Sequence, residues 1–185
     1  MSIDDIKEYV VIVNNGSGCI FQPMDNSYSY VLTAKHNITT ADNKITQLTR
    51  FKLNNNSWDE IEIPFENLVE NENYFPNYER DIAIIKVGKI HDLECIIRID
   101  DIEEERMGYL LVGYPETRRN ANPDKKDNWY RCDENVTIQG LRAHQLREGK
   151  VPGNPGHEEI VGHSGGGILK ISGDYISGIQ IDNAT

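Results

Sequence analysis

The sequence predicts an all-β protein, and three observations favour this fold class. Short apolar segments of about four to seven residues, rich in Val, Ile and Tyr, dominate the 185-residue chain. Asn, Gly, Asp and Pro separate these segments at intervals of roughly ten residues, a spacing typical of barrels and sandwiches. Helical periodicity is scarce. The expected strands, in chain order, are EYVVIV, CIFQP, YSYVLTA, TRFKL, DEIEIP, DIAIIKV, ECIIRI, GYLLVGYP, NVTIQG, GGILKI and YISGIQI.

Helix is expected in two places only. Ser2 and Asp5 have the spacing of a capping box, so the first few residues should form a short helix. A single helical turn is expected after His36. The most polar stretches, 117–128 and 146–159, are rich in Asn, Pro, Gly and charged residues and predict long surface loops.

The acidic run DDIEEER near the middle of the chain suggests a junction between two halves. We therefore expect a first domain over residues 1–100, a connector over 101–106 and a second domain over 107–185. A chain of this length can bury a sizeable core.

The charge balance excludes some partners. A formal net charge of -11 argues against a nucleic-acid surface, which needs clustered Lys and Arg, and against binding to anionic membranes. The apolar runs are too short to span a bilayer. The acidic N-terminus lacks the pattern of a signal peptide, and the odd, scattered set of Cys19, Cys95 and Cys132 suggests reduced thiols, so a cytoplasmic protein is expected.

Three segments carry candidate chemistry. YVLTAKH ends a strand at His36, RDIAIIKV opens one with Asp81, and VGHSGGGILKI places Ser164 in a glycine-rich turn before a strand. A serine hydroxyl needs a base within hydrogen-bond reach, and an imidazole oriented by a carboxylate is suited to that task. Glycines beside the serine let backbone N–H groups approach a developing oxyanion. Each segment alone is a weak signal, but their joint occurrence predicts a catalytic triad.

These segments resemble the conserved boxes of the trypsin and chymotrypsin family. LTAKH resembles LTAAH, DIAIIKV resembles DIALL, and GHSGGG resembles GDSGGP. GSGCIF looks like the strand that precedes the histidine box, and LLVGYP looks like the strand and turn that open the second barrel in the disulfide-free bacterial members. The resemblance covers about residues 9–182 in family order. It implies two six-stranded Greek-key β-barrels, C-terminally abbreviated, with His36 and Asp81 on the first and Ser164 on the second. It also implies an oxyanion hole formed by the N–H groups of Gly162 and Ser164.

A competing interpretation fails on chain order. GHSGG satisfies the nucleophile motif of α/β-hydrolases, in which the acid and the histidine follow the serine. No histidine follows Ser164 in this sequence, and alternating strands and helices are missing.

Two departures from the family concern readiness for catalysis. His163 stands where secreted enzymes carry the aspartate that binds a new N-terminal amine, so activation by trimming is not expected. The chain also stops at Thr185, just after YISGIQI, so we expect either a piece of a longer protein, which we favour, or an abbreviated fold. We therefore expect gating by conformation, by oligomerisation or by a regulatory or sensor partner that orders residues 146–163.

The function predicted is a serine endopeptidase that acts on a protein or peptide through an acyl-enzyme and needs no cofactor or metal. Glu158 and Glu159 fall where the family places the base of its primary pocket, where a carboxylate favours Lys or Arg. The backbone from Gly178 to Ile181 is expected to pair with the substrate. Two alternatives stay open: a protease-like scaffold that does not cleave, and an enzyme that is latent outside its full-length assembly.

Overall fold

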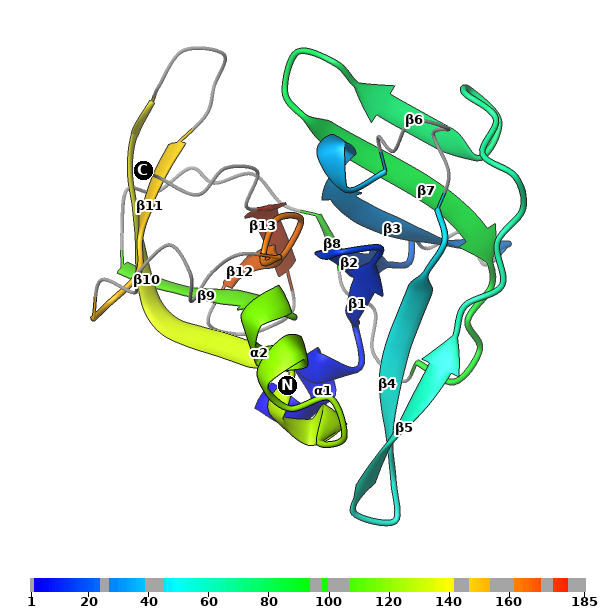
Figure 1. Cartoon of the computed structure of the whole chain (residues 1–185). Helices are drawn as coiled ribbons and strands as arrows, with labels where there is room; N and C mark the ends of the chain where they lie inside the picture. The colour runs from blue at the N-terminus through cyan, green and yellow to red at the C-terminus, as the bar shows by residue number, and fades with distance from the viewer. Residues whose placement is uncertain are drawn as a thin grey trace.

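The computed structural model describes residues 2–23, 27–38, 45–93, 98–99, 107–141, 147–153, 162–170 and 175–179. The regular secondary structure of the described chain is mostly β, as Figure 1 shows. Its helices are short: α1 (Ile3–Lys7), the 3-10 turn η1 (Lys35–Asn37), α2 (Glu116–Ala121) and the 3-10 turn η2 (Lys126–Asn128). The capping box expected at the N-terminus is present, because the Asp5 N–H donates to Ser2 Oγ and the Ser2 N–H donates to the Asp5 carboxylate.

The first sheet has seven strands in the order β5-β4-β1-β2-β3-β7-β6. In this order β4 returns beside β1 after the consecutive hairpins β1-β2-β3, which is a Greek key. Every pair in it is antiparallel. The strands are β1 Val10–Val13, β2 Gly16–Phe21, β3 Tyr28–Ala34, β4 Leu48–Asn54, β5 Ser57–Glu62, β6 Tyr74–Asn77 and β7 Ile82–Gly88.

The second sheet has six strands in the order β11-β10-β9-β12-β13-β8. Here β12 returns beside β9 after the run β9-β10-β11, so this sheet also contains a Greek key. All pairs are antiparallel except the parallel pair of β13 and β8. The strands are β8 Arg98–Ile99, β9 Met107–Gly113, β10 Arg131–Leu141, β11 Arg147–Lys150, β12 Gly167–Lys170 and β13 Tyr175–Ile179.

The hydrophobic core explains why the two sheets stay together. Along β7 buried and partly exposed residues alternate, as expected for a strand with one face on the core. All four residues of β1 are buried. An aromatic cluster joins the sheets: the ring of Phe51 on β4 lies 5.2 Å from that of Tyr114 and 6.0 Å from that of Trp129, the latter in a T-shaped contact. Each such pair contributes about 0.5–1.5 kcal/mol beyond its buried area.

Four segments differ from the sequence expectation. Residues 117–128, expected to be a loop, contain most of α2 and all of η2, and 147–150 within the expected second loop form β11. β6 has no counterpart among the expected strands because Pro76 interrupts it, yet Pro76 is tolerated there since β6 is an outer strand. β8 pairs with β13, so residues 98–99 belong to the second sheet and not to the first domain.

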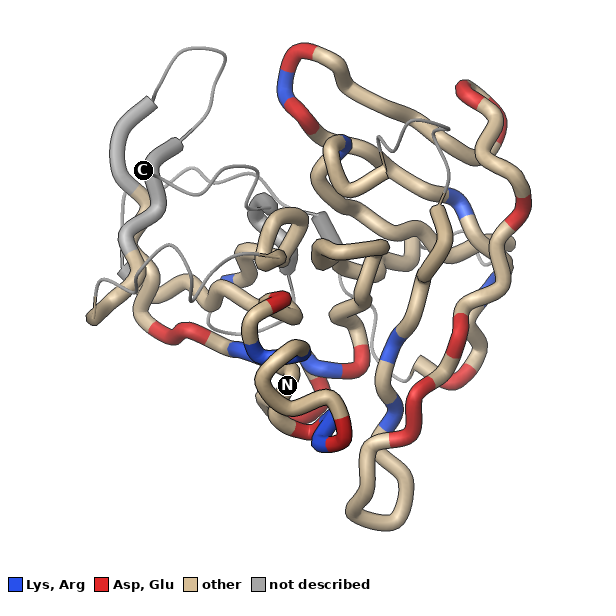
Figure 2. Tube along the Cα trace, in the orientation of Figure 1, with Lys and Arg blue, Asp and Glu red and all other residues tan. Residues whose placement is uncertain are grey.

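Charged side chains are spread widely over the surface. Figure 2 shows acidic residues along β5 and along the loops of the first sheet, with basic residues between them. Among the described residues, no helix is long and apolar enough to cross a membrane.

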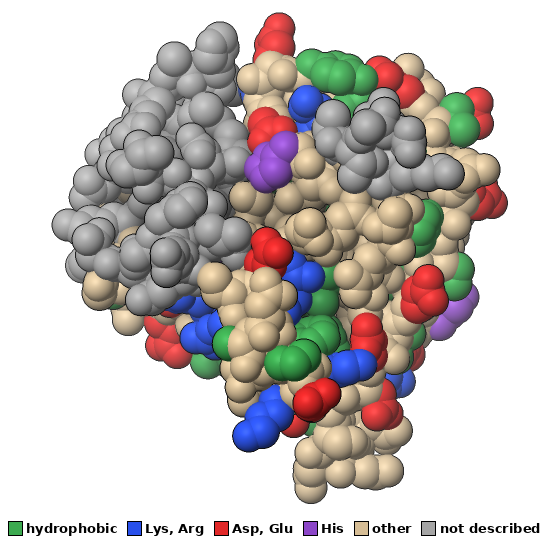
Figure 3. Space-filling model, in the orientation of Figure 1, with side chains coloured by type: hydrophobic (Ala, Val, Ile, Leu, Met, Phe, Trp, Pro, Cys, Tyr) green, Lys and Arg blue, Asp and Glu red, His purple; other side chains and the backbone are tan. Residues whose placement is uncertain are grey.

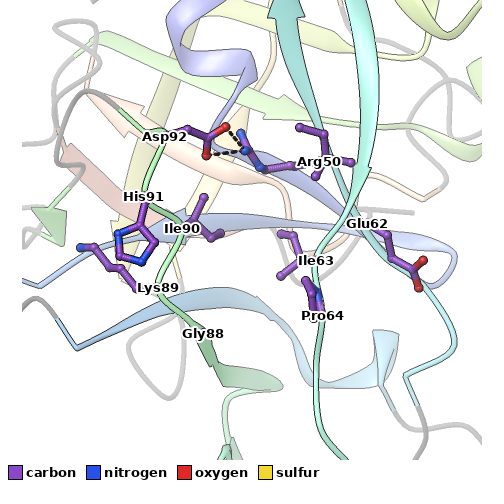
Figure 4. A pocket seen from close by; sticks show the side chains of 10 residues that line it. Arg50, Glu62, Ile63, Pro64, Gly88, Lys89, Ile90, His91 and Asp92 are labelled. Atoms are coloured by element: carbon purple, nitrogen blue, oxygen red, sulfur yellow. Dashed lines mark hydrogen bonds and ion pairs between the residues drawn. The ribbon is translucent and has the colours of Figure 1, made fainter.

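A cavity of about 290 Å³ lies where β7 ends, lined on one side by Ile61, Ile63 and Pro64 and on the other by 88–92. Figure 4 shows the Asp92 carboxylate directed at the guanidinium of Arg50 within it. Because Asp81 precedes the other end of β7, this cavity lies away from the predicted triad.

The ion pair in this cavity is strong on geometric grounds. The Arg50 side chain is only 3% exposed, and its Nη2 donates to both carboxylate oxygens of Asp92, at 2.5 and 2.6 Å. Lys52 Nζ adds a contact of 2.8 Å. Partial burial opposes ionisation, but these hydrogen bonds outweigh it and lower the pKa of Asp92 to about 2. The depressed pKa adds stability that is present above about pH 4 and is lost as the pH falls toward 2.

Asp92→Asn should therefore destabilise the protein at pH 7, because it leaves the Arg50 charge buried without its partner. Since Asp92 is itself 36% exposed, we expect a loss of about 2–3 kcal/mol, below the range for fully buried pairs. Urea unfolding at several pH values measures it, and the deficit should shrink as the pH approaches 2. Lys52→Met is the control, since it removes only the exposed member of the cluster. Equal effects of the two substitutions at pH 7 would contradict this account.

Candidate functional site

Strand register brings His36 and Asp81 together. β3 and β7 are antiparallel neighbours, and Ala34 at the end of β3 lies opposite Ile82 at the start of β7. Residues just after β3 and just before β7 therefore meet at the same edge of the sheet. The Lys35 N–H donates to the Asp81 carbonyl oxygen at 2.8 Å, which continues the ladder by one bond. Asp81 has a φ of 52°, a left-handed conformation that Asp tolerates better than most residues.

The carboxylate of Asp81 holds His36 at two atoms. Its Oδ2 lies 2.5 Å from His36 Nδ1, and its Oδ1 accepts the backbone N–H of His36 at 3.0 Å. A carboxylate only accepts, so in the neutral imidazole the proton sits on Nδ1 and Nε2 has its lone pair available. This is the tautomer that a general base of the predicted kind requires.

This pair is exposed, which limits what it contributes to stability. The side chains of His36 and Asp81 are 46% and 32% exposed. Figure 3 shows a histidine against an acidic side chain on the surface toward the viewer. Ion pairs at such exposure contribute about 0–1 kcal/mol. The His36–Asp81 pair therefore contributes little to the stability of the fold.

Ser164 lies in a tight turn that begins at His163. The Gly166 N–H donates to the His163 carbonyl oxygen at 2.7 Å, and Gly165 at the third position has a φ of +84°. A positive φ at this position is what a type II turn requires, which explains the glycine. Ser164 is 8% exposed and His163 is fully buried.

Ser17 on β2 holds this turn against the first sheet, a role that the sequence did not reveal. Its backbone N–H donates to the Ser164 carbonyl oxygen at 2.8 Å. Its hydroxyl donates to the Gly162 carbonyl oxygen at 3.0 Å and accepts the Tyr114 N–H at 2.8 Å. One fully buried side chain therefore connects the turn at 163–166 and the end of β9 to β2. The only signal in the sequence was a polar residue inside the buried segment GSGCIF.

The described residues include no hydrogen bond between the Ser164 hydroxyl and the His36 ring. Catalytic hydrogen bonds of this kind are often long before substrate binds. The connection that the structure does show runs through the backbone. The Asn37 side-chain amide, next to His36, donates to the Ser164 carbonyl oxygen at 2.7 Å.

The expected oxyanion hole stays a prediction, but the structure explains why residue 162 is glycine. Gly162 has a φ of +81°, and a Cβ there would lie 2.5 Å from the Glu116 backbone nitrogen and 2.8 Å from the Asn15 carbonyl oxygen. No side chain fits at this position.

The predicted substrate-binding residues are only partly described. Glu158, Glu159 and Ile181 lie outside the described residues, as do residues 146 and 154–161 of the loop that a partner was expected to order. Gly178 lies on β13 opposite Ile168. On the other side of β13, β8 pairs only with Tyr175 and Ile176, so within the described part of the chain no second strand lies beside Gly178.

The described cysteines are not reactive nucleophiles. Burial raises the pKa of Cys19 to about 12 and that of Cys132 to about 11, so neither thiol is poised to act as a nucleophile. Both are free cysteines. Over the ranges that the structure describes, no group of three His, Cys, Asp or Glu side chains is placed to hold a metal ion.

The chain is similar to known proteins in its fold. No protein-family model and no curated protein sequence matches the chain. A solved structure of a Glu endopeptidase in complex with MPD is similar, with a TM-score of 0.57 and 14% sequence identity, and the match covers 97% of this chain and 80% of the other. At this identity the likeness shows the fold alone. It confirms the predicted all-β, trypsin-like fold.

Gly165→Ala should disrupt the contact of the turn at 163–166 with the first sheet. Its Cβ would lie 2.0 Å from the Ser17 carbonyl oxygen and 2.5 Å from Thr33 Oγ1. Gly153→Ala is a matched control, because Gly153 has a similar φ of +83° with nothing within 4 Å of the added Cβ. Both substitutions should cost about 1–2 kcal/mol of left-handed strain. Gly165→Ala should cost roughly 1–3 kcal/mol more through overpacking, measurable by chemical denaturation. Equal losses would mean that the turn does not lie against Ser17.

Proposed function

We propose that this chain is a serine endopeptidase in which Ser164 is the nucleophile, His36 the general base and Asp81 the group that orients it. The observation that carries the proposal is the exposed His36–Asp81 pair, held at two atoms, on the sheet against which the Ser164 turn is bonded. The trypsin-like fold agrees with it.

The proposed reaction follows from these atoms. His36 Nε2 takes the proton of the Ser164 hydroxyl as the oxygen attacks the scissile carbonyl carbon. Asp81 stabilises the imidazolium, which then protonates the leaving amine. The acyl-enzyme is hydrolysed by a water that His36 activates in the same way. The N–H groups of Gly162 and Ser164 are the proposed donors to the oxyanion. All of these steps use protein groups and water, with no cofactor.

Substrate binding is proposed to extend the second sheet. The peptide would lie antiparallel to β13 near Gly178, beyond the two residues of β13 that pair with β8 in the described part of the chain. Main-chain hydrogen bonds of this kind bind peptides with little demand on sequence, and adjacent pockets provide the specificity.

Ser164→Ala and His36→Ala should each lower peptide turnover by about 10⁴- to 10⁶-fold, because the members of a triad act as a unit. Hydrolysis of an unbiased peptide library, followed by mass spectrometry, measures this turnover. His91→Gln is the control, since this exposed histidine lies in the cavity at the other end of β7. It should leave turnover unchanged.

Labelling by a fluorophosphonate probe separates the alternatives. A wild-type chain that labels at Ser164, with labelling lost in Ser164→Ala, supports the endopeptidase. A folded chain that neither labels nor cleaves would overturn it in favour of a non-cleaving module. Labelling that appears only in a longer, native form of the protein would indicate a latent enzyme.

A further inference from the structure

We infer that Asn37 is a positioning residue that sets the distance between the base and the nucleophile across the two sheets. This inference rests on the proposed function, since it assigns a task within the same site. Asn37 follows His36 directly and shares the 3-10 turn η1 with it. Its side chain does not touch the reacting atoms. Its contacts instead join the turn that carries His36 to the backbone of Ser164.

The side-chain NH2 group of Asn37 lies close to three acceptors. Nδ2 donates to the Ser164 carbonyl oxygen at 2.7 Å and to Thr33 Oγ1 at 3.1 Å, with a longer contact of 3.3 Å to the Ser17 carbonyl oxygen. Thr33 Oγ1 in turn donates to the Ser17 carbonyl oxygen at 2.6 Å. The Ser164 carbonyl oxygen thus accepts two donors, the Ser17 N–H and the Asn37 amide, both from the first sheet.

The main chain of Asn37 is held as firmly as its side chain. Its carbonyl oxygen accepts the side-chain amide of Asn14 at 2.8 Å, and Asn14 Oδ1 accepts the N–H groups of Thr46 and Gln47. Asn37 therefore lies between the hairpin turn after β1 and the nucleophile turn. A shift of η1 relative to Ser164 would have to break bonds at both ends of this residue.

Two glycines leave the space that the Asn37 amide occupies. A Cβ on Gly16 would lie 2.2 Å from Asn37 Cγ and Oδ1, and a Cβ on Gly165 would lie 2.8 Å from Asn37 Nδ2. Both contacts are closer than Cβ atoms make, so the amide fits only because neither position has a side chain. The glycine after Ser164 therefore serves the contact with the first sheet.

The expected consequence is kinetic. Catalysis depends on holding the reacting atoms within a near-attack geometry, and a displacement of about 1 Å can lower the rate about 10²-fold. Without the amide, Ser164 keeps the Ser17 N–H but loses its only described link to the turn that bears His36. The rate of acylation should fall while substrate affinity, set elsewhere on the second sheet, stays the same.

The test compares Asn37→Leu and Asn37→Asp with wild type. Leu keeps the approximate volume and removes the donors, so kcat and the rate of fluorophosphonate labelling should fall about 10²-fold with KM unchanged. Asp keeps the shape but turns a carboxylate oxygen toward two carbonyl oxygens, so its loss should be larger than that of Leu. A packing role predicts the opposite order, since Asp is closer in shape to Asn.

Asn73→Leu is the matched control. Asn73 is buried, its Oδ1 accepts the Val69 N–H at 2.7 Å, and its Nδ2 donates to the Asn67 carbonyl oxygen at 3.0 Å, all within the first sheet and its loops. Its loss should lower Tm without changing kcat. Equal kcat in wild type, Asn37→Leu and Asn37→Asp would overturn the inference while leaving the proposed function intact.

Hydrogen exchange provides a measurement that needs no activity. The Ser17 N–H donates to the same Ser164 carbonyl oxygen as the Asn37 amide. Release of the turn in Asn37→Leu should accelerate exchange of this N–H, whereas Asn73→Leu should not. Unchanged Ser17 exchange in Asn37→Leu would overturn the inference even if the chain shows no peptidase activity. A wild-type chain that neither labels nor cleaves would overturn the proposed function, and with it the catalytic role of Asn37.

Discussion

The site depends on the hydrogen bonds that the carbonyl oxygen of Ser164 accepts between the two sheets. This oxygen accepts the backbone N–H of Ser17 and the side-chain amide of Asn37, both from the first sheet, while Ser164 itself belongs to the second. Burying this carbonyl without hydrogen-bond donors would cost about 1–3 kcal/mol, so its two donors stabilise the buried position of the turn. This contact requires glycine at residues 16 and 165. A Cβ on Gly16 would clash with the Asn37 amide, and a Cβ on Gly165 would clash with both Ser17 and Asn37.

The positions of His36, Asp81 and Tyr114 depend on the strands from which they come. His36 and Asp81 come from the ends of adjacent antiparallel strands, where register leaves little freedom. Tyr114, which donates its N–H to Ser17 Oγ, packs its ring against Phe51 and so connects the end of β9 to the first sheet a second time. Side chains on strands and tight turns are held more accurately than those on long loops, and a proposed triad divided between two sheets needs that accuracy.

The sequence predicts those elements that depend on local residue properties. It does not predict the strands that form only because a neighbouring strand pairs with them. Apolar segments rich in strand-forming residues, such as YSYVLTA, became strands, here β3 with the same bounds, and the capping box at Ser2 was found as expected. The strand REGK has no apolar alternation and forms because β10 provides the ladder. β6 was missed because proline is excluded from most strands but not from an outer one. His36, Asp81 and Ser164 were selected through motif resemblance, and the structure shows the first two in contact.

The sequence by itself determined the all-β class, most of the strands and the identity of the residues proposed for chemistry, because strand propensity, turn residues and short motifs are local properties. Only the tertiary structure decided which groups hold those residues in place. Ser17 and Asn37 are unremarkable polar residues in the chain, separated from Ser164 by more than a hundred positions. Their role depends on donors and acceptors that strand register and the packing of one sheet on the other bring together. No local sequence pattern predicts such long-range contacts.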